Sequence, residues 1–316
     1  MRVYFTTDIH GSDRCWLKFL ASVKYYNADI IVVGGDLTGK AMVPIVARNN
    51  STFDSDYMGI PRHMKRRDEV DALLKQIANS GNYGVVLSEE EYGGVVNNEP
   101  IRDALIVRLI CERVAKWVAL ADERLAGTGI RCYVSPGNDD FFEIDGVLAA
   151  SQTITVPDGK VVEIGDGFEM LSLGFANETP WQCPRDLPEA QLESKLQRLA
   201  SEVKHMDRAI FNVHVPPYGT GLDEAPRLDS TMRVIVGAFG QPEMVPTGST
   251  AVREAIMKYQ PMLGLHGHIH ESAGIRKLGM TTVVNPGSEY GEGILRGAII
   301  ELDARIGLTD VRLVTG

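Results

Sequence analysis

Residues 2–11 read RVYFTTDIHG, and residues 29–36 read DIIVVGGD. Each stretch begins as a run of β-forming residues and stops at acidic or imidazole side chains, as a strand does where it ends in a loop. Between them, residues 13–26 place apolar side chains at helical spacing, and Ser12 or Asp13 can cap that helix. We therefore predict a β-α-β unit whose two strands end in Asp-x-His and in Gly-Asp.

The same arrangement recurs three times farther along the chain. Apolar runs at residues 131–134, 209–213 and 261–265 are each followed by residue types that bind metals. In open α/β sheets, ligands bind beyond the carboxyl ends of the strands, so side chains from distant segments converge there. Each motif alone is compatible with an ordinary turn or helix cap, but together they predict a shared centre. The candidate metal ligands are Asp8, His10, Asp36, Asn138, His214, His268 and His270.

These motifs resemble those of the calcineurin-like metallophosphoesterases. The matching motifs are D-x-H, G-D, G-N, a lone His and G-H-x-H, in the family's order from residue 8 to residue 270. The run NPGSEYGEG around Asn285 also resembles the strand and turn that end many members. The resemblance implies an α/β fold, a four-layer α/β/β/α sandwich in which two mixed sheets pack together and helices cover both outer faces.

The resemblance also implies that two divalent metal ions share the carboxylate of Asp36. The ligands of the first metal would be Asp8, His10, Asp36 and His270. The ligands of the second metal would be Asp36, Asn138, His214 and His268. Imidazole and carboxylate donors suit Mn, Fe, Zn or Ni, and a bridging carboxylate suits two metals roughly 3.5–4 Å apart. The implied activity is that of a metal-dependent phosphoric ester hydrolase, in which a hydroxide bridging the metals attacks phosphorus in line.

One position departs from the family pattern. Members often carry G-N-H, whose His donates a proton to the leaving group, whereas residues 137–140 here read GNDD. Asp139 therefore stands where the general acid is expected. Beside two dications its carboxyl should stay ionised and donate poorly, and its charge should repel a dianionic monoester more than a monoanionic diester. We therefore expect phosphodiesters, or esters with good leaving groups. His266 is a second candidate for a catalytic role, because His often serves as acid or base.

Other functions are compatible with parts of the sequence. A phosphomonoesterase or pyrophosphatase would protonate the leaving group with water or His266. Replacement of the usual acid also favours a weakened relative that acts as a binding scaffold, although a scaffold has no need of seven intact ligands. Residues 34–41 nearly match a P-loop, but Ala41 stands where a Ser or Thr hydroxyl must bind Mg²⁺.

The composition of the chain limits the kinds of partner that it is expected to bind. The formal net charge of −10 and the pI near 5.3 argue against a nucleic-acid groove, which needs a basic face, so we expect a small phosphoester substrate. The four cysteines form no C-x-x-C pair, which indicates neither a structural zinc motif nor a disulfide framework. No apolar run approaches the ~20 residues of a membrane span. We expect a soluble cytoplasmic protein that does not bind membranes.

A single domain is expected over residues 1–316. The pattern loosens at about residues 41–99, which we interpret as an insertion or cap. Its basic cluster RHMKRR, residues 62–67, either faces solvent or lends positive charge to an anionic substrate. A long amphipathic helix from Pro100 to about Ala126 is predicted to follow.

Overall fold

The computed structural model describes residues 1–48 and 51–316. Its first elements are β1 (Arg2–Thr6), α1 (Asp13–Tyr26) and β2 (Ile30–Val33), which confirm the predicted β-α-β unit. The side chain before α1 accepts a hydrogen bond from the backbone of the first turn, and a left-handed residue follows the last turn. Both features are standard helix ends, so local sequence determines where α1 begins and stops.

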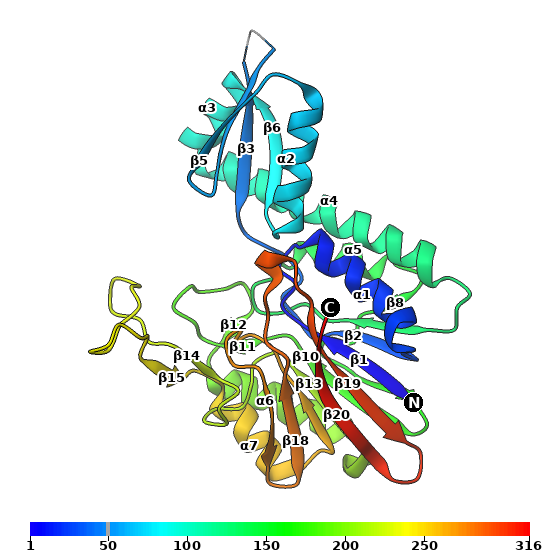
Figure 1. Cartoon of the computed structure of the whole chain (residues 1–316). Coiled ribbons are helices and arrows are strands. Elements are labelled where there is room, and N and C mark those ends of the chain that lie inside the picture. The colour runs from blue at the N-terminus through cyan, green and yellow to red at the C-terminus, as the bar shows by residue number, and fades with distance from the viewer. Residues whose placement is uncertain (49–50) are drawn as a thin grey trace.

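Two six-stranded mixed sheets lie face to face (Figure 1). The strands of the first sheet are, in order, β20 (Gly307–Thr315), β19 (Arg296–Asp303), β1, β2, β7 (Arg131–Val134) and β8 (Ile154–Thr155). The strands of the second sheet are, in order, β17 (Gly274–Leu278), β18 (Thr281–Asn285), β16 (Leu263–Leu265), β13 (Ala209–Val213), β10 (Phe168–Leu173) and β9 (Val161–Gly165). In each sheet four adjacent strands run parallel, and antiparallel strands complete the sheet.

Alternation along the strands places one apolar set between the sheets and another beneath the helices. In β1, for example, Val3 and Phe5 join the core between the sheets, whereas Tyr4 joins the core under the helices. The helices over the first sheet are α1, α4 (Glu99–Leu125) and α5 (Glu143–Ala149). Those over the second are α6 (Glu189–Glu202) and α7 (Thr250–Tyr259). The predicted four-layer α/β/β/α sandwich of two mixed sheets is confirmed.

Short elements occupy the connections between these layers. Two small ladders pair β11 (Ala176–Asn177) with β12 (Asp186–Leu187) and β14 (Glu224–Pro226) with β15 (Met244–Pro246). Single 3₁₀ turns are η1 (Met206–Arg208) and η2 (Tyr290–Glu292). Among the described residues, no helix is both long and apolar enough to cross a membrane.

The segment predicted as an insertion or cap at about residues 41–99 forms a small sheet with two helices, which we call the insertion module. Its strands are, in order, β5 (Ile60–Met64), β4 (Phe53–Tyr57), β3 (Met42–Ala47) and β6 (Tyr83–Ser88), and its helices are α2 (Arg67–Asn79) and α3 (Glu89–Asn97). The module has an apolar core of its own and stands away from the sandwich (Figure 1). Residues 49 and 50 lie outside the described residues, and the module's role as a cap stays a prediction.

The basic cluster of the module is engaged in local ion pairs. His63 lies 2.7 Å from Asp54, and Arg67 lies 3.1 Å from Asp71. These partners are exposed and belong to the module itself. The structure therefore favours the solvent-facing interpretation of RHMKRR over a role in attracting substrate.

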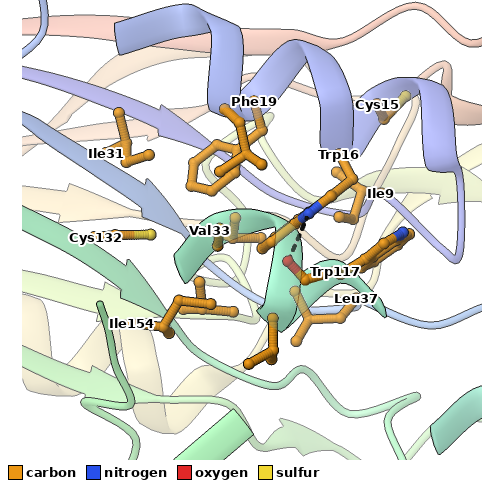
Figure 2. Close-up of a cluster of buried hydrophobic side chains, with 14 of the residues drawn as sticks. Ile9, Cys15, Trp16, Phe19, Ile31, Val33, Leu37, Trp117, Cys132 and Ile154 are labelled. Carbon is orange, nitrogen blue, oxygen red and sulfur yellow. Dashed lines mark hydrogen bonds between the residues drawn. The ribbon is translucent and has the colours of Figure 1, made fainter. Parts of the chain in front are cut away.

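Two stacked indoles join α1 to α4 (Figure 2). The rings of Trp16 and Trp117 lie 5.0 Å apart between centroids, and Trp16 Nε1 donates to the carbonyl of Trp117 at 3.2 Å. Trp117 Nε1 donates to Asp13 Oδ1 at 2.7 Å. Both indole N–H groups therefore keep a partner while the rings are buried, which is the usual condition for burying Trp.

Replacing Trp16 by Ala is expected to lower the free energy of unfolding by about 3–5 kcal/mol, because it removes a buried indole and leaves a cavity. Urea unfolding followed by circular dichroism measures the change. Trp181, which is 65% exposed, provides the control. Trp181→Ala should change the free energy by less than about 0.5 kcal/mol, and similar losses in both variants would contradict the assigned core.

Candidate metal centre

Six of the seven predicted ligands fall into two groups of three. Within each group the ligand atoms all lie within 4.8 Å of one another. The first group contains Asp8, His10 and His270. The second group contains Asp36, His214 and His268. This division is the one that the family resemblance implies for the first and the second metal.

Asp36 connects the two groups. Its Oδ2 lies 3.3 Å from Nε2 of His214, in the second group, and 3.6 Å from Nε2 of His10, in the first. Within the first group, Asp8 Oδ1 lies 3.4 Å from His270 Nε2, which is 3.0 Å from His10 Nε2. The two groups therefore lie side by side, and one oxygen of Asp36 faces both halves, an arrangement that suits the predicted bridging role.

Asn138, the seventh predicted ligand, lies on the loop that approaches Asp36. The backbone N–H of the next residue, Asp139, donates to Asp36 Oδ1 at 3.0 Å. Asn138 Nδ2 donates to Asp186 Oδ1 at 2.9 Å, which fixes the orientation of the amide. Its Oδ1 is buried and has no hydrogen-bond partner within the part of the chain that the structure describes.

A second buried atom shares this property. Nε2 of His214 faces Asp36 Oδ2 at 3.3 Å but forms no well-aligned hydrogen bond to it or to any other residue in the described ranges, while its Nδ1 lies 3.2 Å from the carbonyl of Gly34. Buried polar atoms without partners are uncommon and costly. Both atoms are ligands of the kind that divalent transition metals accept, so coordination would satisfy them. The residues present therefore fit two divalent metals, although binding itself stays a prediction.

The backbone at the strand ends is strained. Asp8, His10, Asp36 and His268 have φ angles of 53°, 38°, 48° and 66°. This left-handed conformation costs a non-glycine residue roughly 1–2 kcal/mol, and such strain concentrates at functional sites. Four of the seven predicted ligands therefore share a feature that stability alone does not favour.

The glycines of the motifs permit close approach between strand ends. A Cβ atom on Gly137 would lie 2.1 Å from Asp36 Oδ1, and one on Gly267 would lie 2.3 Å from Asp8 Oδ2. No side chain fits at either place. The Gly in G-N and in G-H-x-H is thus required because each loop packs directly against a ligand from another strand.

The electrostatics of the centre favour positive charge between the groups. Burial alone would raise the pKa of the Asp36 carboxyl, but the facing imidazoles, foremost His214, outweigh burial and hold that pKa well below its usual range. Burial alone would lower the pKa of His214, yet the charge of Asp36 outweighs it and raises the pKa to about 10. In contrast, burial and the charge of His214 lower the pKa of His268 to about 4. The charge of Asp36 stabilises a proton on His214. The same charge would stabilise a dication bound beside Asp36.

Two residues that position the ligands were not predicted from the sequence. Asp140 is fully buried and accepts hydrogen bonds from the backbones of Leu37, Thr38 and Gly137 at 2.8–2.9 Å. It therefore joins the loop of Asp36 to the loop of Asn138. The only sequence feature that pointed to Asp140 was its place as the second Asp of GNDD, directly after Asp139.

Asn285 has a similar role beneath the G-H-x-H motif. Its Nδ2 donates to the carbonyls of Gly267 and Ile269 at 3.2 and 2.9 Å. These bonds hold the loop that carries His268 and His270. The sequence pattern NPG marked this position as a turn, but not as a support for the predicted ligands.

The two predicted catalytic residues differ in position. Asp139 is at the centre, where its carboxylate forms a further group with His10 and Asp36 within 4.8 Å. His266 has no exposed surface, and its Nδ1 lies 2.7 Å from the carbonyl of Val213. Burial lowers the pKa of His266 to about 4. The structure does not bring His266 to the centre, so contact with a substrate is not supported by its position.

The chain is similar in sequence to a known protein over only about half of its length. No family model matches the chain. The uncharacterized protein MJ1162 of Methanocaldococcus jannaschii is 32% identical over 154 residues, which make up 48% of this chain and 61% of that relative. The matched region thus spans less than two thirds of the relative's length.

Solved structures extend the likeness to the whole chain. The crystal structure of TT1561 of Thermus thermophilus covers 100% of this chain and 97% of its own, with 16% identity and a TM-score of 0.56. The shared feature is the fold. An archaeal phosphodiesterase covers 100% of this chain and 99% of its own, with 11% identity and a TM-score of 0.34.

Asp36→Asn is expected to reduce metal binding in both halves of the centre, whereas Asn138→Ala should affect one half. Elemental analysis of purified, metal-loaded protein should give about two metals per chain for the wild type and about one for Asn138→Ala, since two groups of ligands are present. Asp71→Asn, at an exposed carboxylate in the insertion module, is the control. Two tightly held metals in Asp36→Asn would contradict the bridging role.

Asp140→Asn is expected to weaken metal binding by about 10–100-fold, the usual cost of losing a residue that orients ligands. The side chain of the Asn would place an NH₂ group against backbone N–H donors that bind a carboxylate oxygen in the wild type, so a hydrogen bond would be lost. Titration of the metal-free protein with Mn²⁺ by calorimetry measures the affinity. An unchanged affinity at unchanged thermal stability would show that Asp140 does not position the ligands.

Proposed function

We propose that the protein is a dinuclear-metal phosphoesterase, a hydrolase of small phosphoester substrates. The observation that supports this function best is the position of Asp36 Oδ2, within 3.3 and 3.6 Å of one imidazole from each group. The resemblance to the calcineurin-like metallophosphoesterases and the four-layer fold agree with it. Membership of that family is part of the proposal, and a cytoplasmic location stays a prediction.

The proposed ligands are those of the two groups together with Asn138. Two divalent cations of the Mn, Fe, Zn or Ni type would supply Lewis acidity and lower the pKa of a water molecule. Asp8 and Asp36 would neutralise only half of the charge of two dications. The centre would therefore attract an anionic phosphoester.

The protein's own contribution is to hold these groups and leave one side open. His268 donates its backbone N–H to both oxygens of Asp8, at 3.1 and 3.0 Å. The side chains of His270 and Asp139 are 31% and 22% exposed, whereas Asp36 is nearly inaccessible. A substrate would reach the centre from the side of His270 and Asp139, and the buried ligands Asp8, Asp36 and His214 would be kept from bulk water.

Within this class we infer that phosphodiesters are preferred, because Asp139 stands where related proteins often carry a His. A carboxylate there adds negative charge and donates no proton while ionised. A phosphomonoesterase or pyrophosphatase is the second candidate. It is favoured by Lys40, whose Nζ lies 2.6 Å from Asp139 Oδ1 and offsets that charge.

The substrate class is tested with the metal-loaded protein. Turnover of bis-p-nitrophenyl phosphate is expected to exceed that of p-nitrophenyl phosphate by at least about tenfold in kcat/KM, which corresponds to about 1.4 kcal/mol of extra repulsion for the dianion. His214→Ala should lose both activities, which would show that the reaction belongs to this centre. A clear monoester preference would overturn the diesterase proposal, and no turnover by protein that retains two metals would favour the scaffold.

A further inference from the structure

Lys40 ends the glycine-rich run that nearly matches a P-loop, and the structure gives this run a different role. In a P-loop the lysine is followed by a helix whose N-terminus faces phosphates. Here strand β3 begins at Met42, two residues after Lys40. The near match therefore forms no phosphate-binding helix end. The Lys40 side chain instead lies against Asp139.

The two residues that precede Lys40 are held by hydrogen bonds and close packing. Thr38 donates through its N–H and its hydroxyl to Asp140 Oδ1, at 2.8 and 2.6 Å. The N–H of Gly39 donates to Tyr83 Oη at 3.2 Å, and Gly39 packs against the carbonyl of Gly81. The start of the Lys40 side chain is thus fixed with respect to Asp36, which lies on the same loop.

The ammonium group of Lys40 lies at the accessible margin of the metal centre. Its Nζ is 2.6 Å from Asp139 Oδ1 and 3.4 Å from Cys183 Sγ. The Cys183 thiol donates to the same Oδ1 at 2.7 Å. Because the backbone N–H of Asp139 donates to Asp36, a continuous series of contacts joins the ammonium to the proposed bridging ligand.

One donor of this ammonium remains available. An ammonium has three N–H groups, and two have partners, Asp139 and Cys183, in the described part of the chain. The Lys40 side chain is 41% exposed, on the same margin as Asp139. Exposed ion pairs of this kind stabilise a fold little, so the pair has no strong structural purpose.

We propose that Lys40 is a substrate-binding residue whose ammonium donates a hydrogen bond to an anionic oxygen of the phosphoester. The proposal rests on the proposed function and adds a residue that lies outside both ligand groups. Asp139 acts as the positioning residue for Lys40. The ammonium offsets part of the charge of Asp139 and still has an N–H for the substrate.

The test measures binding of inorganic phosphate to metal-loaded protein by calorimetry. Lys40→Met is expected to weaken phosphate binding by about 10–100-fold, the range for a lost hydrogen bond to a charged group. Lys160→Met is the control, because Lys160 is exposed and its ammonium donates to the carbonyl of Val156 at 3.4 Å and not to a residue of the centre. Metal content and thermal stability are measured for each variant, and Lys40→Met binding phosphate as the wild type does would overturn the proposal.

A double variant separates direct contact from simple charge balance. Asp139→Asn keeps the ammonium of Lys40 and an amide oxygen that can accept from it, so phosphate binding should weaken much less than in Lys40→Met. In Lys40→Met with Asp139→Asn both charges are removed together, yet phosphate binding should stay weak because the donor is missing. Recovery to the wild-type affinity would show that Lys40 only balances the charge of Asp139, and would overturn the contact.

These outcomes differ from failure of the proposed function. If the wild-type protein hydrolyses a phosphoester and Lys40→Met binds phosphate normally, only the role of Lys40 is wrong. If the metal-loaded wild type neither hydrolyses esters nor binds phosphate, the phosphoesterase proposal itself is wrong.

Discussion

The carboxylate of Asp36 is the group on which the rest of the site depends. It is buried between two sheets, and a buried charge is costly unless it is paired and hydrogen-bonded. Its Oδ2 faces His10 and His214, and its Oδ1 accepts the backbone N–H of Asp139. Each partner comes from a different strand end, so the position of one carboxylate determines how three loops must lie.

This requirement ties the site to the packing of the two sheets. Asp36 follows β2 in the first sheet, whereas His214 follows β13 in the second. The two sheets are held together by an apolar core that includes Val32 and Ile210, side chains within these two strands. A shift of one sheet over the other would separate the halves of the centre. The left-handed backbone at Asp36 persists because the surrounding strands and loops over-determine it.

The sequence predicted the parts of the molecule in which local pattern and burial agree. The ends of the buried parallel strands can be read from the sequence, because apolar core residues give way abruptly to Asp, Asn or His there. The pattern was less informative for β4 and β5, whose polar side chains pair with one another at exposed positions, so that their sequence resembles a polar loop. For His266 the end of the apolar run is a poorer guide, because the strand pairing continues past it. Its backbone N–H still donates to the carbonyl of Val284 in the neighbouring strand. Lys40 could not be found from spacing, because nothing in the order of residues shows that a side chain from one loop meets Asp139 on another.

The Lys40–Asp139 pair also changes how the proposed substrate side of the centre is connected to the fold. A single imidazole would depend on one loop, whereas an ammonium held by a carboxylate depends on two, after β2 and after β7. The first of these loops is bonded to Tyr83 at the base of the insertion module, and Arg113 of α4 stacks on the same ring at 4.5 Å. Displacement of the module would therefore reach Lys40 through Gly39, and it would also reach the predicted ligand His10, whose carbonyl packs closely against Gly81. The module is thus connected both to the proposed substrate contact at Lys40 and, through His10, to one half of the proposed metal centre.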